Sequence, residues 1–390
     1  MKPRWTKTKN HRRSIFLQSF LTFTFFVAME LTTWVPLRFW KVWGGGGFID
    51  TAQVLNYGEC YGQIGNRIFN SDEGNCSNYL YGTSLVRILD YLSIGKENSY
   101  LVGFALALLL SLSLTQIFPI KNFFEGVYYA LLISSPPILL LVERGNFDTL
   151  IFILVFLSAY FYSKNHILIA FLLISVSILI KFYTAPLLIF FLVRNYKIYM
   201  AGMIWTITFF TLFVAVQDIK LIGNFPSGTS GKFGFNLWSL HFEEESRFVG
   251  NQVQSFVINT LVFTFTISLF FMSLKFKLID EIKLRDWQKS FPRNSTTISF
   301  FAVVLITCFF AGLNFDYRLI FFAALNLLIV KKVSGRSSKM LYLYSLSVLW
   351  LTYPSAGLAP IGDLLLEMFV VAIFWFGMLK LHLRVKRRGL

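Results

Sequence analysis

Long apolar runs are the feature that most constrains how this chain can fold. Crossing the hydrocarbon core of a bilayer takes about 20 apolar residues in an α-helix. The 390-residue chain contains eleven or twelve such runs, and the run at 185–193 is either a short span, a half-helix or a continuation of the run before it. The runs cover residues 15–37, 100–118, 123–142, 149–163, 166–180, 185–193, 198–216, 253–274, 297–313, 319–330, 340–353 and 362–382.

The composition agrees with a lipid environment. Hydrophobic residues make up 55% of the chain and charged residues only 14%, whereas a soluble domain has about a quarter charged residues. These values exclude a soluble globular protein, a disordered chain and a disulfide-rich secreted module. We predict an all-α polytopic membrane protein with about 11–12 transmembrane helices, forming one integral-membrane domain over residues 1–390.

The basic residues predict the orientation of the chain. The tail at 1–14 carries six basic residues and no acid, and Lys and Arg accumulate on the cytoplasmic side of membranes. Alternating sides from a cytoplasmic N-terminus places 25 of the 36 Lys and Arg residues inside, including those of the tail at 383–390. The net charge of +16 therefore reports topology and contact with membrane lipids, not nucleic acid. A compact, short-tailed chain favours a bacterial inner membrane, with both termini cytoplasmic and the functional face periplasmic.

Two long loops fall on the predicted outer face, at residues 38–99 and 217–252. In the first loop we expect short amphipathic helices at 50–57 and 84–92, lying along the membrane surface. The apolar positions that repeat at helical spacing in the second of these are Leu85, Ile88, Leu89 and Leu92.

The same loop holds two of the three cysteines, Cys60 and Cys76. In an oxidising compartment they form a disulfide, and otherwise they are two free thiols. The sequence leaves both interpretations open.

Ionisable and polar residues gather at the predicted outer ends of the spans, where burial of a charge is costly and often functional. They are Asp50 after the first span, Glu143, Arg144, Asn146 and Asp148 between the third and fourth, Lys181 after the fifth, and Asp316 and Arg318 between the ninth and tenth. The structural alternatives are an N-cap for Asp50, a solvated loop with an Asp N-cap for the fourth span at 143–148, an Asp316–Arg318 pair at a helix cap, and snorkelling for Lys181. A shared site predicts instead that these side chains converge.

The second outer loop adds Trp238 and His241 to the candidate site. Trp238 is suited to stacking on a sugar ring, and His241 to contact with a phosphate or hydroxyl. The alternative for Trp238 is an aromatic anchor at the membrane interface.

No nucleotide-binding fingerprint or metal-ligand motif is present in the sequence. A site on the outer face would therefore receive its energy-rich donor through the lipid. This arrangement resembles the GT-C superfamily of integral-membrane glycosyltransferases, and most closely glycosyltransferase family 87, the polyprenol-phosphate-mannose type. The stretches that carry the resemblance are Asp50 to Tyr57, E-R-G-N-F-D at 143–148, K-F-Y-T-A-P at 181–186 and N-F-D-Y-R at 314–318.

The resemblance implies transfer of a mannose-like hexose from a polyprenyl-phosphate sugar to a hydroxyl of a glycan or glycolipid acceptor, with inversion at the anomeric carbon. It implies that Asp50 is the catalytic base and that Lys181, Arg144 and Arg318 stabilise the leaving phosphate. Glu143, Asn146, Asp148, Asp316, Trp238 and His241 are expected to bind substrate. The scheme requires no cofactor and no metal, although the acidic residues are suited to hold a divalent ion.

Two alternatives remain. A polyprenyl-linked O-antigen ligase or polymerase would depend on His241 and Arg247 more than on Asp50. A polytopic lipid or sugar transporter or flippase would need charged or discontinuous helices near the middle of the bilayer.

Overall fold

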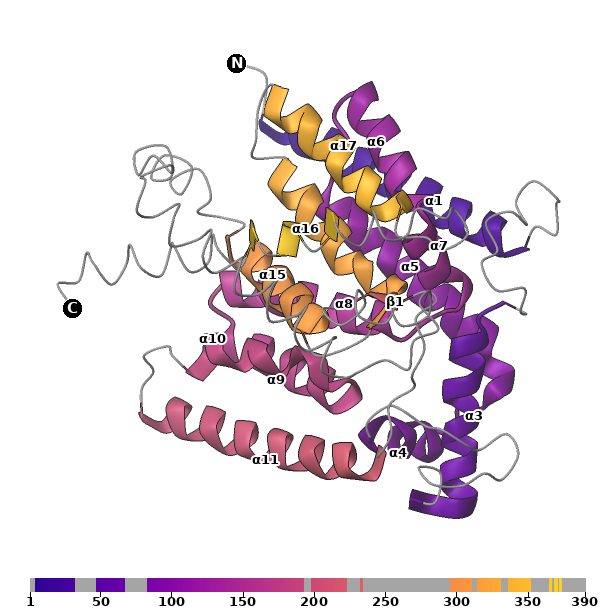
Figure 1. Ribbon diagram of the computed structural model, residues 1–390, viewed down its shortest axis with the longest axis vertical. Coiled ribbons are helices and arrows are strands. Elements are labelled where there is room, and N and C mark those ends of the chain that lie inside the picture. The colour runs from indigo at the N-terminus through magenta and orange to yellow at the C-terminus, as the bar shows by residue number, and fades with distance from the viewer. Residues whose placement is uncertain are drawn as a thin grey trace, which may run out of the picture.

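The computed structural model describes residues 4–31, 47–66, 83–192, 198–222, 232–233, 295–310, 314–330 and 336–351, with short helical pieces at 365–366, 368–370 and 372–373. Nearly all of this is helix (Figure 1). The elements in chain order are α1 (Arg4–Leu31), α3 (Ile49–Ile64), α4 (Thr83–Tyr91), η3 (Lys96–Asn98), α5 (Ser99–Ile117), α6 (Phe123–Ile133), α7 (Pro136–Glu143), α8 (Asp148–Ser163), α9 (Ile167–Ile180), η4 (Phe182–Leu188), α10 (Ile189–Leu192), α11 (Ile198–Ile222), β1 (Lys232–Phe233), α15 (Ser295–Phe310), β2 (Asn314–Phe315), η5 (Asp316–Leu319), α16 (Ile320–Val330) and α17 (Arg336–Leu351).

Two of the described helices are long and apolar enough to cross a membrane, at Lys96–Ile117 and Tyr199–Val216. The pair α6 and α7 adds a third candidate if its two halves form one span, and several apolar helices of 10–17 residues accompany them. These helices indicate a membrane protein. The predicted span at 253–274 and most of the one at 362–382 lie outside the described residues.

The surface of the helices supports contact with lipid. Large apolar side chains are widely exposed along α11, where Trp205 is 59% and Phe209 74% accessible, and along α1, where Phe16 is 72% accessible. A soluble monomer rarely exposes apolar patches larger than a few hundred Å². Lipid tails are the natural cover for such faces.

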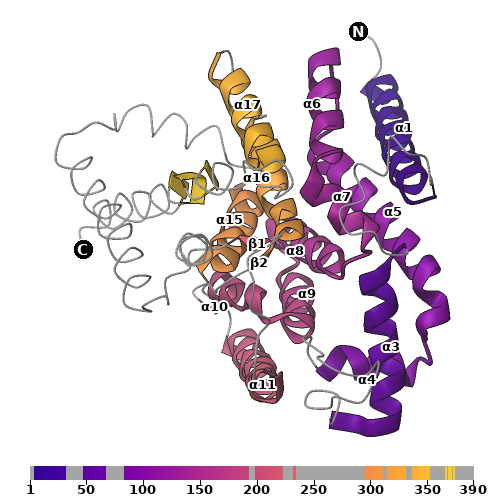
Figure 2. The same cartoon turned by 45° about the vertical axis from the view of Figure 1, so that its right-hand side comes forward.

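The two prolines that begin α7, Pro136 and Pro137, lie at a bend in the chain. Proline cannot donate a backbone hydrogen bond and disfavours a helical residue before it. Accordingly α6 ends at Ile133, α7 begins at Pro136, and their axes differ by 56°. Figure 1 and Figure 2 both show α6 beside α17 at the top of the molecule, with α11 below α9 at the bottom.

The short segment after α9 runs back across the bundle. At its start the Lys181 ammonium bonds the carboxylate of Asp148, the first residue of α8. At its end the carbonyl of Phe190 accepts a hydrogen bond from Tyr162, near the last residue of α8. Together η4 and α10 therefore cover most of the length of α8, about 24 Å for 16 residues. The segment therefore turns back beside α8 as a short apolar helical stretch and does not continue α9.

A two-residue antiparallel pair departs from the all-α prediction. Strand β1 pairs with β2 so that Lys232 faces Phe315 and Phe233 faces Asn314. This pair joins part of the second predicted outer loop to the N-F-D-Y-R turn. The loop also begins later than predicted, because α11 continues to Ile222 rather than ending at residue 216.

The first outer loop contains both predicted short helices, with corrections. The first, α3, is longer than 50–57, and α4 buries Leu85, Val86 and Leu89 against the rest of the protein. Ile88 and Leu92, predicted to share the apolar face, are each 55% exposed. The reason is close packing of α4 on α3, where a Cβ at Gly58 would meet Leu89 at 2.8 Å.

The cysteines are described in part. Cys60 is disulfide-bonded, whereas Cys308 is buried and forms no disulfide. The predicted partner of Cys60, Cys76, lies outside the described residues.

Candidate functional site

The start of α3 is docked on the turn that follows α7. The first N–H groups of a helix and the last carbonyls of another have no partner within their own helix. Here they satisfy each other: Phe48 N–H donates to the Glu143 carbonyl at 2.8 Å, and Asp50 N–H donates to the Arg144 carbonyl at 2.9 Å. The Thr51 hydroxyl adds a 2.5 Å bond to the Gly145 carbonyl. This docking fixes the position of Asp50.

The docking requires glycine at position 145. Gly145 has φ of 58°, the left-handed region that favours glycine. A Cβ there would also collide with the Thr51 hydroxyl and approach the Phe48 ring to 2.8 Å. The sequence E-R-G-N-F-D therefore allows a close approach that other residues would prevent.

Phe48 anchors the same junction to α5. Its backbone is left-handed, with φ of 56°, and its side chain is buried. The ring packs edge-on against Tyr100 and Phe104 and directly over Gly103. Burial of the ring offsets the backbone strain, which is about 1–2 kcal/mol for a residue other than glycine.

The carboxylate of Asp50 is bound by two side chains of the turn. Arg144 donates to Oδ1 from Nε at 2.8 Å and from Nη2 at 2.5 Å, and Asn146 donates to Oδ2 at 2.5 Å. Asp50 is therefore not the N-cap of its helix, since Phe48 holds that position without a side-chain cap bond. Its negative charge in the first turn of α3 is also favoured by the helix dipole.

A second carboxylate lies at the centre of a larger ion-pair cluster. Asp148 is fully buried, and its Oδ1 accepts bonds from the Lys181 ammonium at 2.8 Å and from the Tyr183 hydroxyl at 2.7 Å. Its Oδ2 accepts a bond from Arg318 Nε at 3.2 Å. Arg318 also lies 4.8 Å from the centre of the Tyr183 ring, a cation–π arrangement.

Asn146 joins the two clusters. Its Nδ2 donates to Asp50, and its Oδ1 accepts the backbone N–H of Asp148 at 2.8 Å. Asp50 is also close enough to Lys181 for the two charges to attract each other. One polar network, which we call the site network, thus contains Asp50, Arg144, Asn146, Asp148, Lys181, Tyr183 and Arg318.

The structure brings together most of the sequence-predicted residues, though not all in the predicted roles. Arg144 and Lys181 are ion-paired with carboxylates of the protein, so they are not a bare cationic cluster. Glu143 contributes its backbone carbonyl to the docking of α3. Trp238 and His241 lie outside the described residues, and of Asp316 only the backbone, in η5, is described.

Sequence reasoning missed Tyr183 and Thr51. Both are uncharged, and neither stands out at a helix end. The signal for Tyr183 was its position two residues after Lys181, in a stretch that Pro186 keeps out of regular α-helix. Thr51 follows the candidate base directly, but its partner carbonyl is 94 residues away.

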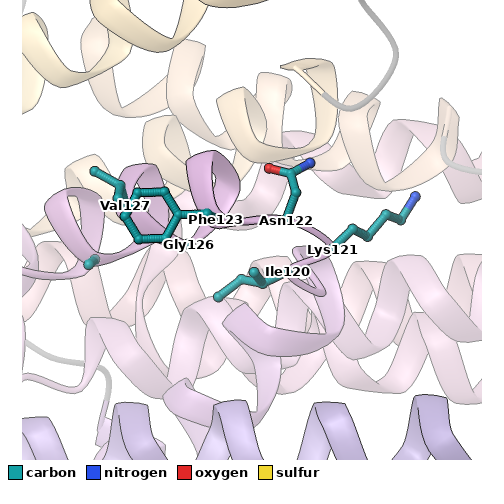
Figure 3. Close-up of a pocket in the computed structure, with 7 residues that line it drawn as sticks. Ile120, Lys121, Asn122, Phe123, Gly126 and Val127 are labelled. Atoms are coloured by element: carbon teal, nitrogen blue, oxygen red, sulfur yellow. The ribbon is translucent and has the colours of Figure 1, made fainter.

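In the described part of the chain an open pocket of about 540 Å³ lies beside the first turns of α6, and none of its lining residues belongs to the site network (Figure 3). It surrounds the turn between α5 and α6, and in Figure 3 Lys121 points away from Phe123 and Val127. The part of α5 from Gly103 to Ile117, about 21 Å long, separates this turn from the Phe48 junction. The cavity contains none of the candidate site residues.

Among the described residues no group of three or more His, Cys, Asp or Glu side chains is arranged to hold a metal ion. Comparisons of the chain with known protein families, curated proteins and solved structures give no match. The resemblance to glycosyltransferase family 87 therefore stays a prediction.

Proposed function

We propose that the protein is an integral-membrane glycosyltransferase with a GT-C-like arrangement of about 11–12 spans. It transfers a mannose-like hexose from a polyprenyl-phosphate sugar to a hydroxyl of a lipid-linked or cell-envelope glycan. The site network is its active site, on the periplasmic face of a bacterial inner membrane. The observation that carries the proposal is the placement of Asp50, a carboxylate held by Arg144 and Asn146 at the end of an apolar bundle.

The environment of Asp50 supports the role of a base. Arg144 binds one oxygen of the carboxylate and Asn146 binds the other, so both oxygens are held by side chains of the turn. Each carboxylate oxygen has two lone-pair sites. Arg144 occupies both sites of Oδ1, and Asn146 occupies one site of Oδ2, so one site of Oδ2 remains for an acceptor hydroxyl. The docked backbone of α3 holds the carboxylate in one orientation, and a fixed orientation is what general-base catalysis needs.

The proposed reaction is a single displacement. The acceptor hydroxyl oxygen forms a bond to C1 of the donor sugar as the bond from C1 to the phosphate oxygen breaks. The hydroxyl proton passes to Asp50, and polyprenyl phosphate leaves with the bonding electron pair. Nearby cations lower the energy of the transition state by stabilising the negative charge that develops on the phosphate.

The distribution of charge disfavours the transporter alternative. Between their first and last residues, α5, α8, α9, α15 and α16 contain no charged side chain. An ion or substrate pathway through a bundle usually needs ionisable groups at membrane depth. Of these five helices only α8 contains a charged residue, its first residue Asp148, and Lys181 and Arg318 lie just outside the ends of α9 and α16, as a site at the membrane surface requires.

The test is transfer of radiolabelled hexose from polyprenyl-phosphate hexose in membranes that contain Asp50→Asn. We expect transfer to fall at least about 100-fold, the lower limit for loss of a general base. Asp90→Asn, which alters an exposed carboxylate of α4, is the matched control and should transfer normally. Asp50→Glu keeps the charge and should retain part of the activity. Full activity of Asp50→Asn at normal expression would refute the proposal.

A further inference from the structure

The open pocket beside the first turns of α6, which we call the α6 pocket, lies where the chain leaves one candidate span and enters the next. The apolar helix at Lys96–Ile117 ends just before the turn at 118–122, and the bent pair of α6 and α7 begins at Phe123. A turn between two consecutive spans lies at the level of the lipid headgroups, because the spans themselves fill the hydrocarbon thickness. The predicted topology puts this turn on the cytoplasmic side.

The α6 pocket is apolar at one end and charged at the other. The apolar residues that line it are Ile120, Phe123, Val127 and Ala130. Figure 3 shows the Lys121 side chain extending away from Phe123 and Val127. Gly126 keeps the pocket open, since a Cβ there would meet only Ile120, at 3.7 Å. Its volume of about 540 Å³ is in the range of sites that hold a small molecule.

The apolar end of the pocket continues along α6 as an exposed stripe. Phe123, Val127 and Leu131 follow one another at intervals of four residues, and all three are exposed, Phe123 most of all at 87%. Side chains four residues apart lie on the same face of a helix. From Phe123 to Leu131 the stripe is about 12 Å long. An acyl chain that descends from headgroup level into the bilayer fits this stripe.

The charged end of the pocket carries one group of each sign. The Lys121 ammonium is exposed, and Glu125 Oε2 accepts the Lys121 backbone N–H at 2.8 Å, so the carboxylate lies at the base of the lysine side chain. Within the described part of the chain, neither the ammonium nor Glu125 Oε1 has a protein partner. The helix end itself is already capped, because the Asn122 side chain accepts the Glu125 N–H at 2.9 Å.

We propose that the α6 pocket binds one molecule of phosphatidylethanolamine. The Lys121 ammonium binds the lipid phosphate, the Glu125 carboxylate accepts a hydrogen bond from the ethanolamine ammonium, and one acyl chain lies along the stripe of α6. This headgroup is the complement of one cation and one anion, since both contacts are charge-assisted. Phosphatidylglycerol has no cation for Glu125, and the trimethylated ammonium of phosphatidylcholine has no N–H to donate. The site is independent of the proposed transferase activity.

The test is photolabelling of the full-length protein in phosphatidylcholine vesicles that contain a little phosphatidylethanolamine with a photoactivatable acyl chain. We expect labelled residues within 120–131. Unlabelled phosphatidylethanolamine should suppress this labelling at about fivefold lower concentration than phosphatidylglycerol with the same chains, the factor expected for one charge near the membrane surface. The exposed apolar face of α11 at 203–213 is the internal control, because labelling there should respond equally to both lipids.

Three variants test the two contacts and the pocket. Glu125→Gln removes the charge but keeps an acceptor for the Lys121 N–H, and it should abolish the advantage of phosphatidylethanolamine over phosphatidylglycerol. Lys121→Gln should weaken labelling of 120–131 about fivefold. Gly126→Leu fills the pocket and should also weaken it, with α11 labelled normally. Lys164→Gln, which alters an exposed lysine on the next turn of the same predicted side, is the matched control and should change nothing.

Three outcomes would overturn the inference. They are equal suppression by the two lipids in the wild-type protein, an unchanged advantage of phosphatidylethanolamine in Glu125→Gln, and labelling of α11 without labelling of 120–131. Stronger suppression by phosphatidylglycerol would likewise reject the zwitterionic headgroup and indicate that Lys121 alone attracts lipid. If Gly126→Leu does not fold, the two glutamine variants decide the question, because both leave the capping bonds of α6 in place.

Discussion

Removal of the charge of Asp148 should destabilise the protein more than removal of Lys181. Asp148→Asn keeps the shape of the side chain but leaves Lys181 and Arg318 as two adjacent cations, one of them buried, without their carboxylate. Breaking a buried ion pair from one side costs about 3–5 kcal/mol. Lys181→Met instead leaves Asp148 paired with Arg318 and bonded to Tyr183. Its cost should be about 1.5–3 kcal/mol, the value of one hydrogen bond to a charged group.

The double variant Asp148→Asn/Lys181→Met is the sharpest part of this test. Without the buried ammonium, only the partly exposed Arg318 lacks its carboxylate. The double variant should therefore be more stable than the sum of the single effects predicts, by about 1–3 kcal/mol. The free energy of unfolding can be measured by titration with SDS from mixed micelles, with Asp90→Asn as a control expected to change it by less than about 0.5 kcal/mol. Strict additivity, or an Asp148→Asn variant as stable as the control, would refute the ion-pair argument.

Three further predictions concern the docking of α3, the contact between α6 and α17, and the membrane topology. Gly145→Ala should lower the free energy of unfolding by about 2–3 kcal/mol, because the alanine is strained in the left-handed region and the Thr51 bond is lost, and it should also reduce hexose transfer. The control Gly202→Ala, in open space on α11, should be neutral or stabilising. Equal thermal stability of the two variants would contradict the docking geometry. Tyr128→Phe removes the 2.7 Å hydrogen bond between the Tyr128 and Ser345 hydroxyls and should lower the free energy of unfolding by about 1 kcal/mol in the same SDS titration. No change would show that this bond does not stabilise the contact between α6 and α17. In intact vesicles, single cysteines at the exposed positions Lys164→Cys and Tyr91→Cys should react with an impermeant maleimide from opposite sides; labelling from the same side would contradict the predicted topology.

The position of the candidate site was largely predictable from the sequence. Charges are so costly in lipid that the few at span ends stand out, and alternation of the spans placed Asp50, Asp148 and Lys181 on one side. The structure places these three in one network. Their partners were not predictable in the same way, because a cation at a span end can bind a substrate or a carboxylate of the protein. Only the folded geometry decides between these, and it pairs Lys181 with Asp148.

Local features that depend on close approach were beyond the sequence. The α4 helix shows this, because its apolar stripe carries no signal for which residues contact α3: Leu89 packs against Gly58, whereas Ile88 stays exposed. The pairing of β1 with β2 joins residues more than 80 positions apart through backbone groups alone, and side-chain patterning carries no signal for it. The bend at Pro136 and Pro137 was predictable because it follows from proline itself.

The wide sequence separation of the contacts around Asp148 has a consequence for biogenesis. Lys181 follows Asp148 by 33 residues, but Arg318 follows it by 170. During membrane insertion the carboxylate can thus be neutralised early by the nearby ammonium, long before the arginine is synthesised. A Lys181 variant would leave Asp148 unpaired in the membrane throughout that interval. Such a variant should be more exposed to quality-control proteolysis during synthesis than its equilibrium stability alone would suggest.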